Sequence, residues 1–142
     1  MPCFQWGNRD LTDEYVSAID SLQTVVGDYG TLAHIIIMND LNVKIPLARK
    51  FQGTSAMNQG FNANSKIMYD FVVGNDLNMG DFTYPQSSNY TYLQHTLGIY
   101  TKIDHILISS YNKSINSCLI TPKHPDNLSN HLLISIYVSI IL

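Results

Sequence analysis

The sequence has few charged residues. They make up 13% of its 142 residues, against the ~25% typical of soluble domains, and the formal net charge is −3. There is no run of lysine or arginine, so the chain lacks the basic surface on which a free-standing nucleic-acid binder relies. This balance argues against tight autonomous DNA binding, but it leaves room for a metal site that acts on a phosphodiester.

Cysteines and long apolar segments are also scarce. Cys3 and Cys118 are too few and too far apart for a disulfide framework or a zinc pattern, so we expect two unpaired thiols in a reducing compartment. The first residues contain no apolar signal-peptide core, and the apolar tail Leu132 to Leu142 is far shorter than the ~20 residues of a membrane span. We therefore expect an intracellular protein, nuclear or cytoplasmic, with no membrane partner.

The length fits one domain, and the early part of the chain has the pattern of an α/β layer. Asp10 or Thr12 can cap a helix whose apolar residues recur at three- and four-residue intervals, and Gly27 and Gly30 end it. The apolar strand Ala33–Met38 follows, and its pattern predicts a strand that is covered on both faces.

The later elements are shorter. The pattern predicts a loop over 46–65, a helix from Ser65 to Gly74, and extended segments at 81–84, 90–93, 102–109, 115–120 and within 132–142. Several polar side chains are interpreted as structural: Asp76 and Asp81 as turn caps, His95, His105 and His124 as exposed or structural, and Tyr84, Tyr90 and Tyr92 as packing residues.

Four polar positions stand out from this pattern. Asp40 and Asn42 end an apolar strand two residues apart, so an extended chain would point both at one spot beyond the strand, where open α/β sheets hold ligands. The alternative is that the strand simply ends in a turn, where Asp and Asn are common. Asp104 lies inside an apolar strand, which is costly without a cation or strong donor, and His131 lies at the start of the last strand.

Four segments, three of which contain these residues, follow one another along the chain: Ile35–Asn42, Asp81–Tyr84, Lys102–Ser109 and Ser129–Ile134. In that order they resemble the Gly-Asp-Phe-Asn, Phe-Thr-Tyr, Arg-Ile-Asp-Tyr-Ile-Leu-Val-Ser and Ser-Asp-His-Leu-Pro-Val motifs of the endonuclease/exonuclease/phosphatase family. The resemblance runs from Tyr15 to Val138 and is greatest to the endonuclease modules of LINE-type retrotransposons.

The resemblance implies a Mg²⁺-dependent phosphodiesterase that acts on DNA. Asp40 would orient and deprotonate the attacking water, and Asn42 would hold that water or a phosphate oxygen. Asp104 would accept a hydrogen bond from His131, which would donate to a phosphate oxygen as negative charge builds. The metal ligands would be Asp40 and, weakly, Asn130, which stands where the family has an Asp.

The resemblance also implies an incomplete domain. The family fold has two similar halves, with two packed sheets and outer helices. Residues 1–142 are expected to be its C-terminal half, a single partial α/β domain with a mixed sheet and helices on one face. The absent N-terminal half supplies a metal-binding Glu, and Glu14, the sole Glu of this chain, lies in a predicted helix. We therefore expect weak Mg²⁺ binding and impaired or no hydrolysis.

The sequence leaves other interpretations open. The chain could be a non-catalytic remnant or an interaction module derived from a retrotransposon endonuclease, and a sheet face left uncovered by the missing half would then promote self-association. An upstream coding segment could also be missing from the sequence. The loops carry no base-reading signature, so the substrate of the relatives could be DNA, RNA, an inositol phosphate or a lipid.

Overall fold

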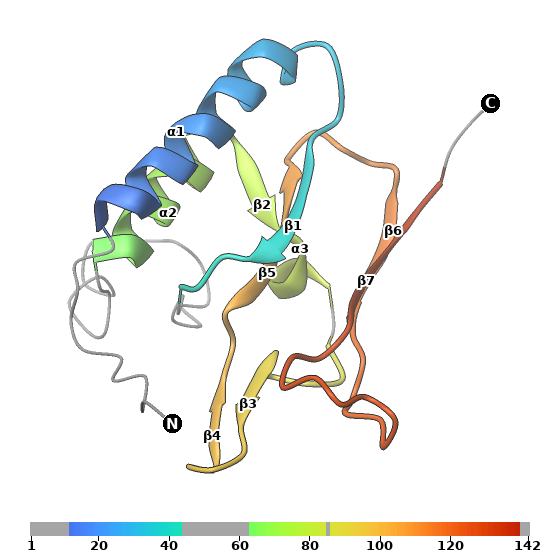
Figure 1. Ribbon diagram of the computed structural model, residues 1–142. Coiled ribbons are helices and arrows are strands. Elements are labelled where there is room, and N and C mark those ends of the chain that lie inside the picture. Colours follow the sequence, from blue (N-terminus) through green and yellow to red (C-terminus); the bar gives the residue numbers. More distant parts are fainter. Residues whose placement is uncertain (1–11, 44–62, 85, 140–142) are drawn as a thin grey trace, which may run out of the picture.

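The structure, a computed structural model, describes residues 12–43, 63–84 and 86–139 (Figure 1). Its elements in chain order are α1 (Thr12–Tyr29), β1 (Ile36–Asp40), α2 (Ala63–Gly74), β2 (Leu77–Met79), α3 (Gly80–Thr83), β3 (Tyr92–Gln94), β4 (Ile99–Thr101), β5 (Asp104–Ser109), β6 (Ile115–Ile120) and β7 (Ile134–Val138). Within those ranges, no helix has the length and apolar character needed to cross a membrane.

The strands form three small antiparallel sheets. Strands β1, β5 and β2 make a three-stranded sheet with β5 in the centre, while β3 pairs with β4 and β6 pairs with β7. The expected α/β class is confirmed. Every strand pairing among the described residues is antiparallel, however, so the mixed sheet expected from the sequence is not found there. The two-sheet sandwich stays a prediction.

The central strand β5 lies between two apolar layers. On one side α1 and α2 lie together (Figure 1), and Ile19 and Met68 of these helices belong to one buried cluster with Leu107. On the other side Ile106 and Ile108 pack against the β6–β7 hairpin. Side chains alternate along a strand, which is why neighbouring residues of β5 enter different layers. The face of β5 away from the helices is therefore covered within this chain.

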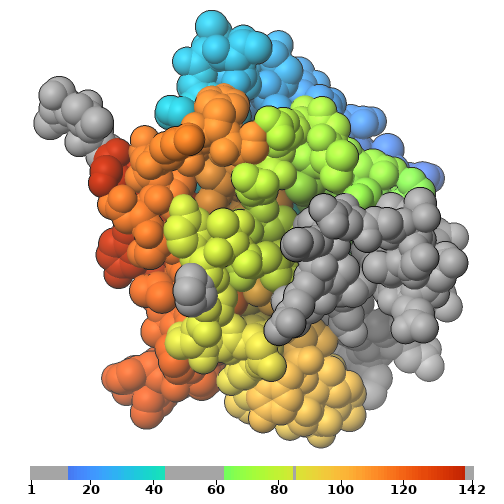
Figure 2. Space-filling view, turned by 180° about the vertical axis from the view of Figure 1, so that it is seen from behind, coloured from blue at the N-terminus to red at the C-terminus, as the bar shows by residue number. Residues whose placement is uncertain are grey.

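The segment that leads from β2 to β3 crosses the back of the molecule. Figure 2 shows this yellow-green segment between the helices and the β6–β7 region, with the β3–β4 hairpin extending below it. The helical turn α3 lies in this segment and contacts β5 and β6. The α3 turn therefore reaches the central strand β5 from a side that α1 and α2 do not cover.

The helices follow the sequence pattern more closely than the strands do. Both long helices lie where helices were predicted, and β6 spans the predicted 115–120. Strand β1 begins and ends later than the predicted Ala33–Met38. It is an edge strand in which Ile36 and Met38 are 37% and 45% exposed, so the prediction of a strand covered on both faces was wrong. Most of the predicted loop 46–65 lies outside the described residues.

The predicted strand at 81–84 is instead the helical turn α3. A Cβ on Gly80 would lie 2.6 Å from Cδ1 of Ile108, so the chain can approach β5 this closely because residue 80 is a glycine. The carboxylate of Asp81 then accepts the N–H of Ile106 at 3.1 Å. The prediction of Asp81 as a turn cap was therefore wrong, because its side chain is a buried acceptor for the central strand.

Candidate functional site

Asp40, Asp104 and His131 come together where β1 ends and β5 begins. One potential ligand atom of each residue lies within 4.8 Å of the other two. A small hollow of about 190 Å³ beside them is lined in part by Asp40, Asp104 and Leu132. Three groups that are far apart in the sequence are therefore gathered beside one solvent-accessible depression.

The ladder between β1 and β5 sets the two carboxylates opposite each other. Asp40 and Asp104 are direct partners in the antiparallel register, and just beyond them the N–H of Leu41 donates to the carbonyl of Ile103 at 3.0 Å. Directly opposed residues share one face of a sheet, and like charges in such a pair are destabilising. The arrangement is favourable only when a cation or strong donors lie nearby.

His131 supplies one such partner, and its expected hydrogen bond with Asp104 is present. Nδ1 of His131 lies 3.0 Å from each oxygen of Asp104, and the two side chains are 36% and 13% exposed. Residue 131 also forms an isolated β-bridge with Tyr92, whose ring centroid lies 4.9 Å from that of the imidazole. Nε2 of His131 has no hydrogen-bond partner among the described residues, so it is available to a bound molecule.

Asn42 does not continue β1. Its φ is 53°, in the left-handed region, and its N–H donates to Oδ1 of Asp40 at 2.9 Å. This is the turn that the sequence left open as the alternative, so strand alternation does not place the two side chains together as predicted. Asn42 is exposed and lies directly beside the Asp40 carboxylate.

Asn130, the weak metal ligand expected from the resemblance, is exposed and directly precedes His131. Its main-chain carbonyl accepts the N–H of Leu93 at 2.9 Å, while its side chain makes no hydrogen bond to a described residue. The contacts therefore explain how Asn130 anchors the chain beside His131, and its role as a metal ligand stays a prediction.

A second aspartate–histidine pair lies on the other face of β5. The buried His105 places Nδ1 3.0 Å from Oδ2 of Asp81, and its Nε2 lies 3.2 Å from the carbonyl oxygen of Val43. Nζ of Lys102 lies 3.1 Å from the same carboxylate oxygen. The interpretation of His105 as structural is confirmed. The available signal for this network was the pair of basic side chains in one apolar strand, which requires an acidic partner elsewhere.

The surroundings of Asp81 determine its charge. Burial acts to raise the pKa of its carboxyl group, but the hydrogen bond from His105, the charges of His105 and Lys102, and the Ile106 N–H together hold that pKa below its ordinary 3.8. Asp81 is therefore ionised at neutral pH. Both ring nitrogens of His105 face oxygen atoms, so each of them has a partner inside the protein.

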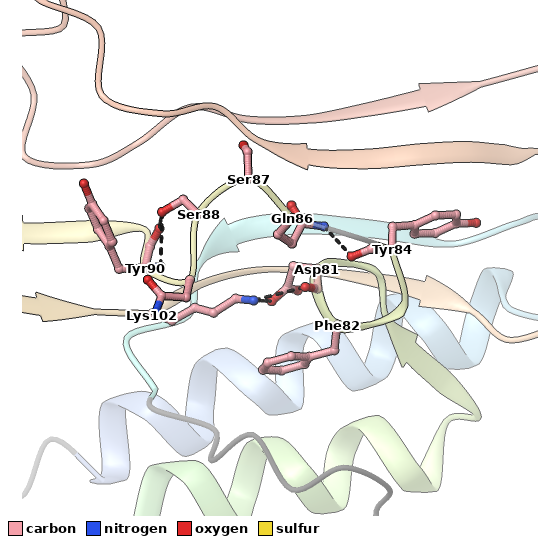
Figure 3. A pocket seen from close by; sticks show the side chains of 9 residues that line it. Asp81, Phe82, Tyr84, Gln86, Ser87, Ser88, Tyr90 and Lys102 are labelled. Carbon is pink, nitrogen blue, oxygen red and sulfur yellow. Dashed lines mark hydrogen bonds and ion pairs between the residues drawn. The ribbon is translucent and has the colours of Figure 1, made fainter.

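A hollow of about 500 Å³ lies beside this network (Figure 3). It is lined by Asp81, Phe82, Tyr84, Gln86, Ser87, Ser88, Asn89, Tyr90 and Lys102. Several of its polar groups already have partners. The side-chain amide of Gln86 donates to two main-chain carbonyls and accepts one main-chain N–H. Ser87 donates to the carbonyl of Ile120, and Lys102 binds Asp81. The hollow therefore offers a ligand few unpaired polar groups.

His95, His124 and Cys118 belong to neither of the two aspartate–histidine pairs. His95 is exposed, and the exposed His124 pairs with Asp126 at 3.4 Å between Nδ1 and Oδ2. Cys118 is buried, and burial raises the pKa of its thiol to about 11, which fits the expected idle thiol. Cys3 lies outside the described residues.

The other predicted structural residues make local contacts. The carboxylate of Asp76 accepts the hydroxyl of Ser110, whose N–H donates to the carbonyl of Asp76 at 3.0 Å. The hydroxyl of Tyr84 donates to a carbonyl of β6, and the rings of Tyr90 and Tyr100 meet edge to face at 4.8 Å between centroids. Tyr84 and Tyr90 therefore pack as the sequence predicted, and so does Tyr92, whose ring lies against that of His131.

Comparisons with known proteins do not assign a function to this arrangement. No protein-family model matches the chain, and no curated protein matches it. The cluster of Asp40, Asp104 and His131 is therefore interpreted from its own chemistry. Carboxylate oxygens suit a hard divalent cation, and an imidazole with one open nitrogen suits proton transfer or hydrogen bonding to an anionic oxygen.

Proposed function

We propose that this chain is a metal-dependent phosphodiesterase of low activity that hydrolyses nucleic acid, with Mg²⁺ as its cofactor. The observation that carries the proposal is the convergence of Asp40, Asp104 and His131 from three separate parts of the chain. Two opposed carboxylates favour a divalent cation, and the open nitrogen of His131 is suited to a phosphate oxygen. The ordered motifs that resemble the endonuclease/exonuclease/phosphatase family support the same reaction.

The donor set fits a hard divalent cation but supplies little negative charge. Oδ1 of Asp40 accepts the main-chain N–H of Asn42, which leaves Oδ2 for a metal. Both oxygens of Asp104 face His131. Mg²⁺ is commonly held by one or two carboxylates together with waters and substrate phosphates. When bound here, it would offset the charge that develops on the leaving oxygen. We expect binding to be weak because Asp40 is the one carboxylate of the cluster that has no cationic partner among the described residues.

Each side chain has a separate role in this mechanism. Asp40 orients the attacking water and accepts its proton, and Asn42, adjacent in the turn, holds that water or a phosphate oxygen. Asp104 accepts the hydrogen bond from Nδ1 of His131, fixes the ring and stabilises its positive charge. Nε2 then donates to a non-bridging phosphate oxygen as negative charge builds in the transition state.

A nicking assay on supercoiled plasmid DNA, with and without Mg²⁺, tests the proposal. We expect slow, Mg²⁺-dependent nicking by the full chain, and a loss of about 10²-fold or more in Asp40→Ala and in His131→Ala, because each removes a group that moves or stabilises charge. Asp70→Ala is the matched control, since Asp70 is an exposed carboxylate that pairs with Lys66 on α2.

The result that would overturn the proposal is equally specific. No nicking at any Mg²⁺ concentration, or nicking that persists unchanged in both site variants, would remove the catalytic role. A titration of the full chain with Mg²⁺, followed by NMR, adds a second measurement. We expect the amide signals of Asp40 and Asp104 to move, and those of α2 to stay in place.

A second candidate function, a non-catalytic interaction module, is favoured by the exposed apolar residues of two strands. Ile36 and Met38 of β1 and Tyr137 and Val138 of β7 are each at least 37% exposed, and β1 is an edge of its sheet. Exposed apolar edges promote association between copies. Light scattering on purified protein separates the two functions: concentration-dependent dimers without nicking favour the module, and a stable monomer argues against it.

A further inference from the structure

Thr91 lies at the junction of the elements that carry Asp104 and His131. It is fully buried, with 0% of its surface exposed, just before β3. Its Oγ1 accepts the N–H of Asp104 at 3.0 Å and the N–H of Ile103 at 3.1 Å. One hydroxyl therefore satisfies two consecutive main-chain donors at the start of β5.

The main chain of Thr91 and its neighbours holds the other member of the pair. The carbonyl of Thr91 accepts the N–H of Leu132 at 2.7 Å, and the N–H of Leu93 donates to the carbonyl of Asn130 at 2.9 Å. These two bonds lie on either side of His131, which forms its own bridge with Tyr92. Residues 91–93 therefore hydrogen-bond to the main chain on both sides of His131, at residues 130 and 132.

These contacts matter because the Asp104–His131 contact requires close alignment. Nδ1 of His131 lies 3.0 Å from both carboxylate oxygens, so a small shift of either main chain would lengthen at least one contact. Hydrogen bonds weaken steeply as distance and angle leave their optimum. A buried residue that bonds to the Asp104 main chain through its side chain, and to the Leu132 main chain through its carbonyl, is placed to set that alignment.

We propose that Thr91 is a positioning residue that fixes the Asp104 carboxylate against the His131 imidazole. The expected effect on hydrolysis rests on the proposed function, whereas the expected effect on the Asp104–His131 contact does not. Thr91 is fully buried, so it acts through the main chain of Asp104 and has no contact with substrate. Without its hydroxyl, two part-buried N–H groups lose their acceptor, and the first residues of β5 shift to find another.

Thr91→Val tests the proposal, because valine keeps the shape and removes the acceptor, while Thr91→Ser keeps the hydroxyl. Thr83→Val is the matched control, since the hydroxyl of Thr83 donates to the carbonyl of Met79 in the turn before it. We expect Thr91→Val to lower kcat for Mg²⁺-dependent nicking about 10- to 100-fold with KM unchanged, as for other residues that orient a catalytic group. Thr91→Ser and Thr83→Val should keep wild-type kcat. If Thr91→Val does not fold by circular dichroism, Thr91→Cys replaces it, because sulfur is a weak acceptor.

A second measurement does not depend on activity. NMR spectra that correlate ring protons with ring nitrogens report the hydrogen bond at Nδ1 of His131, with the signal assigned by a His131→Gln variant. We expect Thr91→Val to move this signal most of the way to its position in Asp104→Ala, and Thr91→Ser to leave it in place. If the wild-type chain does not nick DNA, the proposed function fails and this spectrum alone decides the role of Thr91. An unchanged His131 signal in a folded Thr91→Val overturns the inference.

Discussion

Two aspartate–histidine pairs use neighbouring residues of the same strand in opposite ways. Asp104 faces the surface cluster and pairs with His131, while His105 faces the interior and pairs with Asp81. The Nδ1–carboxylate distance is 3.0 Å in both pairs. Nδ1 of His131 faces both oxygens of its aspartate and Nδ1 of His105 faces one, but the larger difference between the pairs lies in their surroundings.

The difference lies in how many of the polar atoms are already used. The interior pair is complete, because Lys102 and the Ile106 N–H bind the carboxylate and the Val43 carbonyl faces the second ring nitrogen. The surface pair leaves Nε2 of His131 without a partner among the described residues. A buried pair must satisfy every donor and acceptor to be tolerated, whereas an unused donor is what a catalytic group needs.

Removing the interior carboxylate should have the largest effect on stability. Asp81→Ala removes the carboxylate that Lys102 and the buried His105 both contact, so we expect the free energy of unfolding to fall by about 3–5 kcal/mol. Asp104→Ala should change it by no more than about 1 kcal/mol, because the side chain of His131 is 36% exposed and water can replace the lost carboxylate. Urea unfolding of both variants measures the contrast.

Asp126→Ala is the control for these two variants. The His124–Asp126 pair is exposed on both side chains, and we expect no measurable change in stability when it is removed. Equal losses for Asp81→Ala and Asp104→Ala would show that the two pairs stabilise the fold equally, which contradicts a mainly structural role for the interior pair alone.

The next largest effect should be the loss of stability at acid pH that the interior pair causes. The pKa of Asp81 is lower in the folded protein than its ordinary 3.8, so its contribution to stability is present above about that pH and is lost as the pH falls through the folded value. We expect the unfolding free energy of the wild type to fall more steeply below pH ~4 than that of Asp81→Asn, which has no carboxyl group to protonate. Parallel curves would contradict the assigned role of Asp81.

The smallest expected effect concerns the opposed carboxylates of the surface cluster. Asp40→Asn removes the like-charge contact with Asp104 and keeps an oxygen that can accept the Asn42 N–H. Without divalent cations, we expect thermal unfolding to show a gain of about 0.2–1 kcal/mol. Added Mg²⁺ should stabilise the wild type more than this variant, and a metal-independent loss of stability would contradict the assignment.

Part of this arrangement could be predicted from the sequence for a physical reason. Asp104 stands in an apolar strand where an unpaired carboxylate is costly, so a partner was expected, and the resemblance of the motifs indicated His131 as that partner. The helices were also predictable, because long amphipathic repeats are strong signals. Of the three strands of three residues, β2 and β4 were not predicted, since three residues are too few to show a period, while β3 overlaps the predicted segment 90–93.

The interior pair could not be predicted in the same way. Asp81 follows Gly80 and precedes aromatic residues, which is typical of an extended segment, so the sequence interpretation made it part of a strand with a capping side chain. Its true position depends on the close approach of Gly80 to Ile108, a contact between segments that are distant in the sequence. The turn at Asn42 was left open for a related reason, because Asp and Asn are common both at turns and at ligand sites.

Asp104 and His105 are consecutive residues of β5, so their side chains point to opposite faces of the strand. Deletion of one residue within this strand would turn an imidazole toward solvent and a carboxylate into the apolar interior, because side chains alternate with a period of two. Such a change would disrupt the core and the surface cluster together. A chain that folds with an intact interior pair has therefore also placed Asp104 on the opposite face of β5, the face from which it reaches His131.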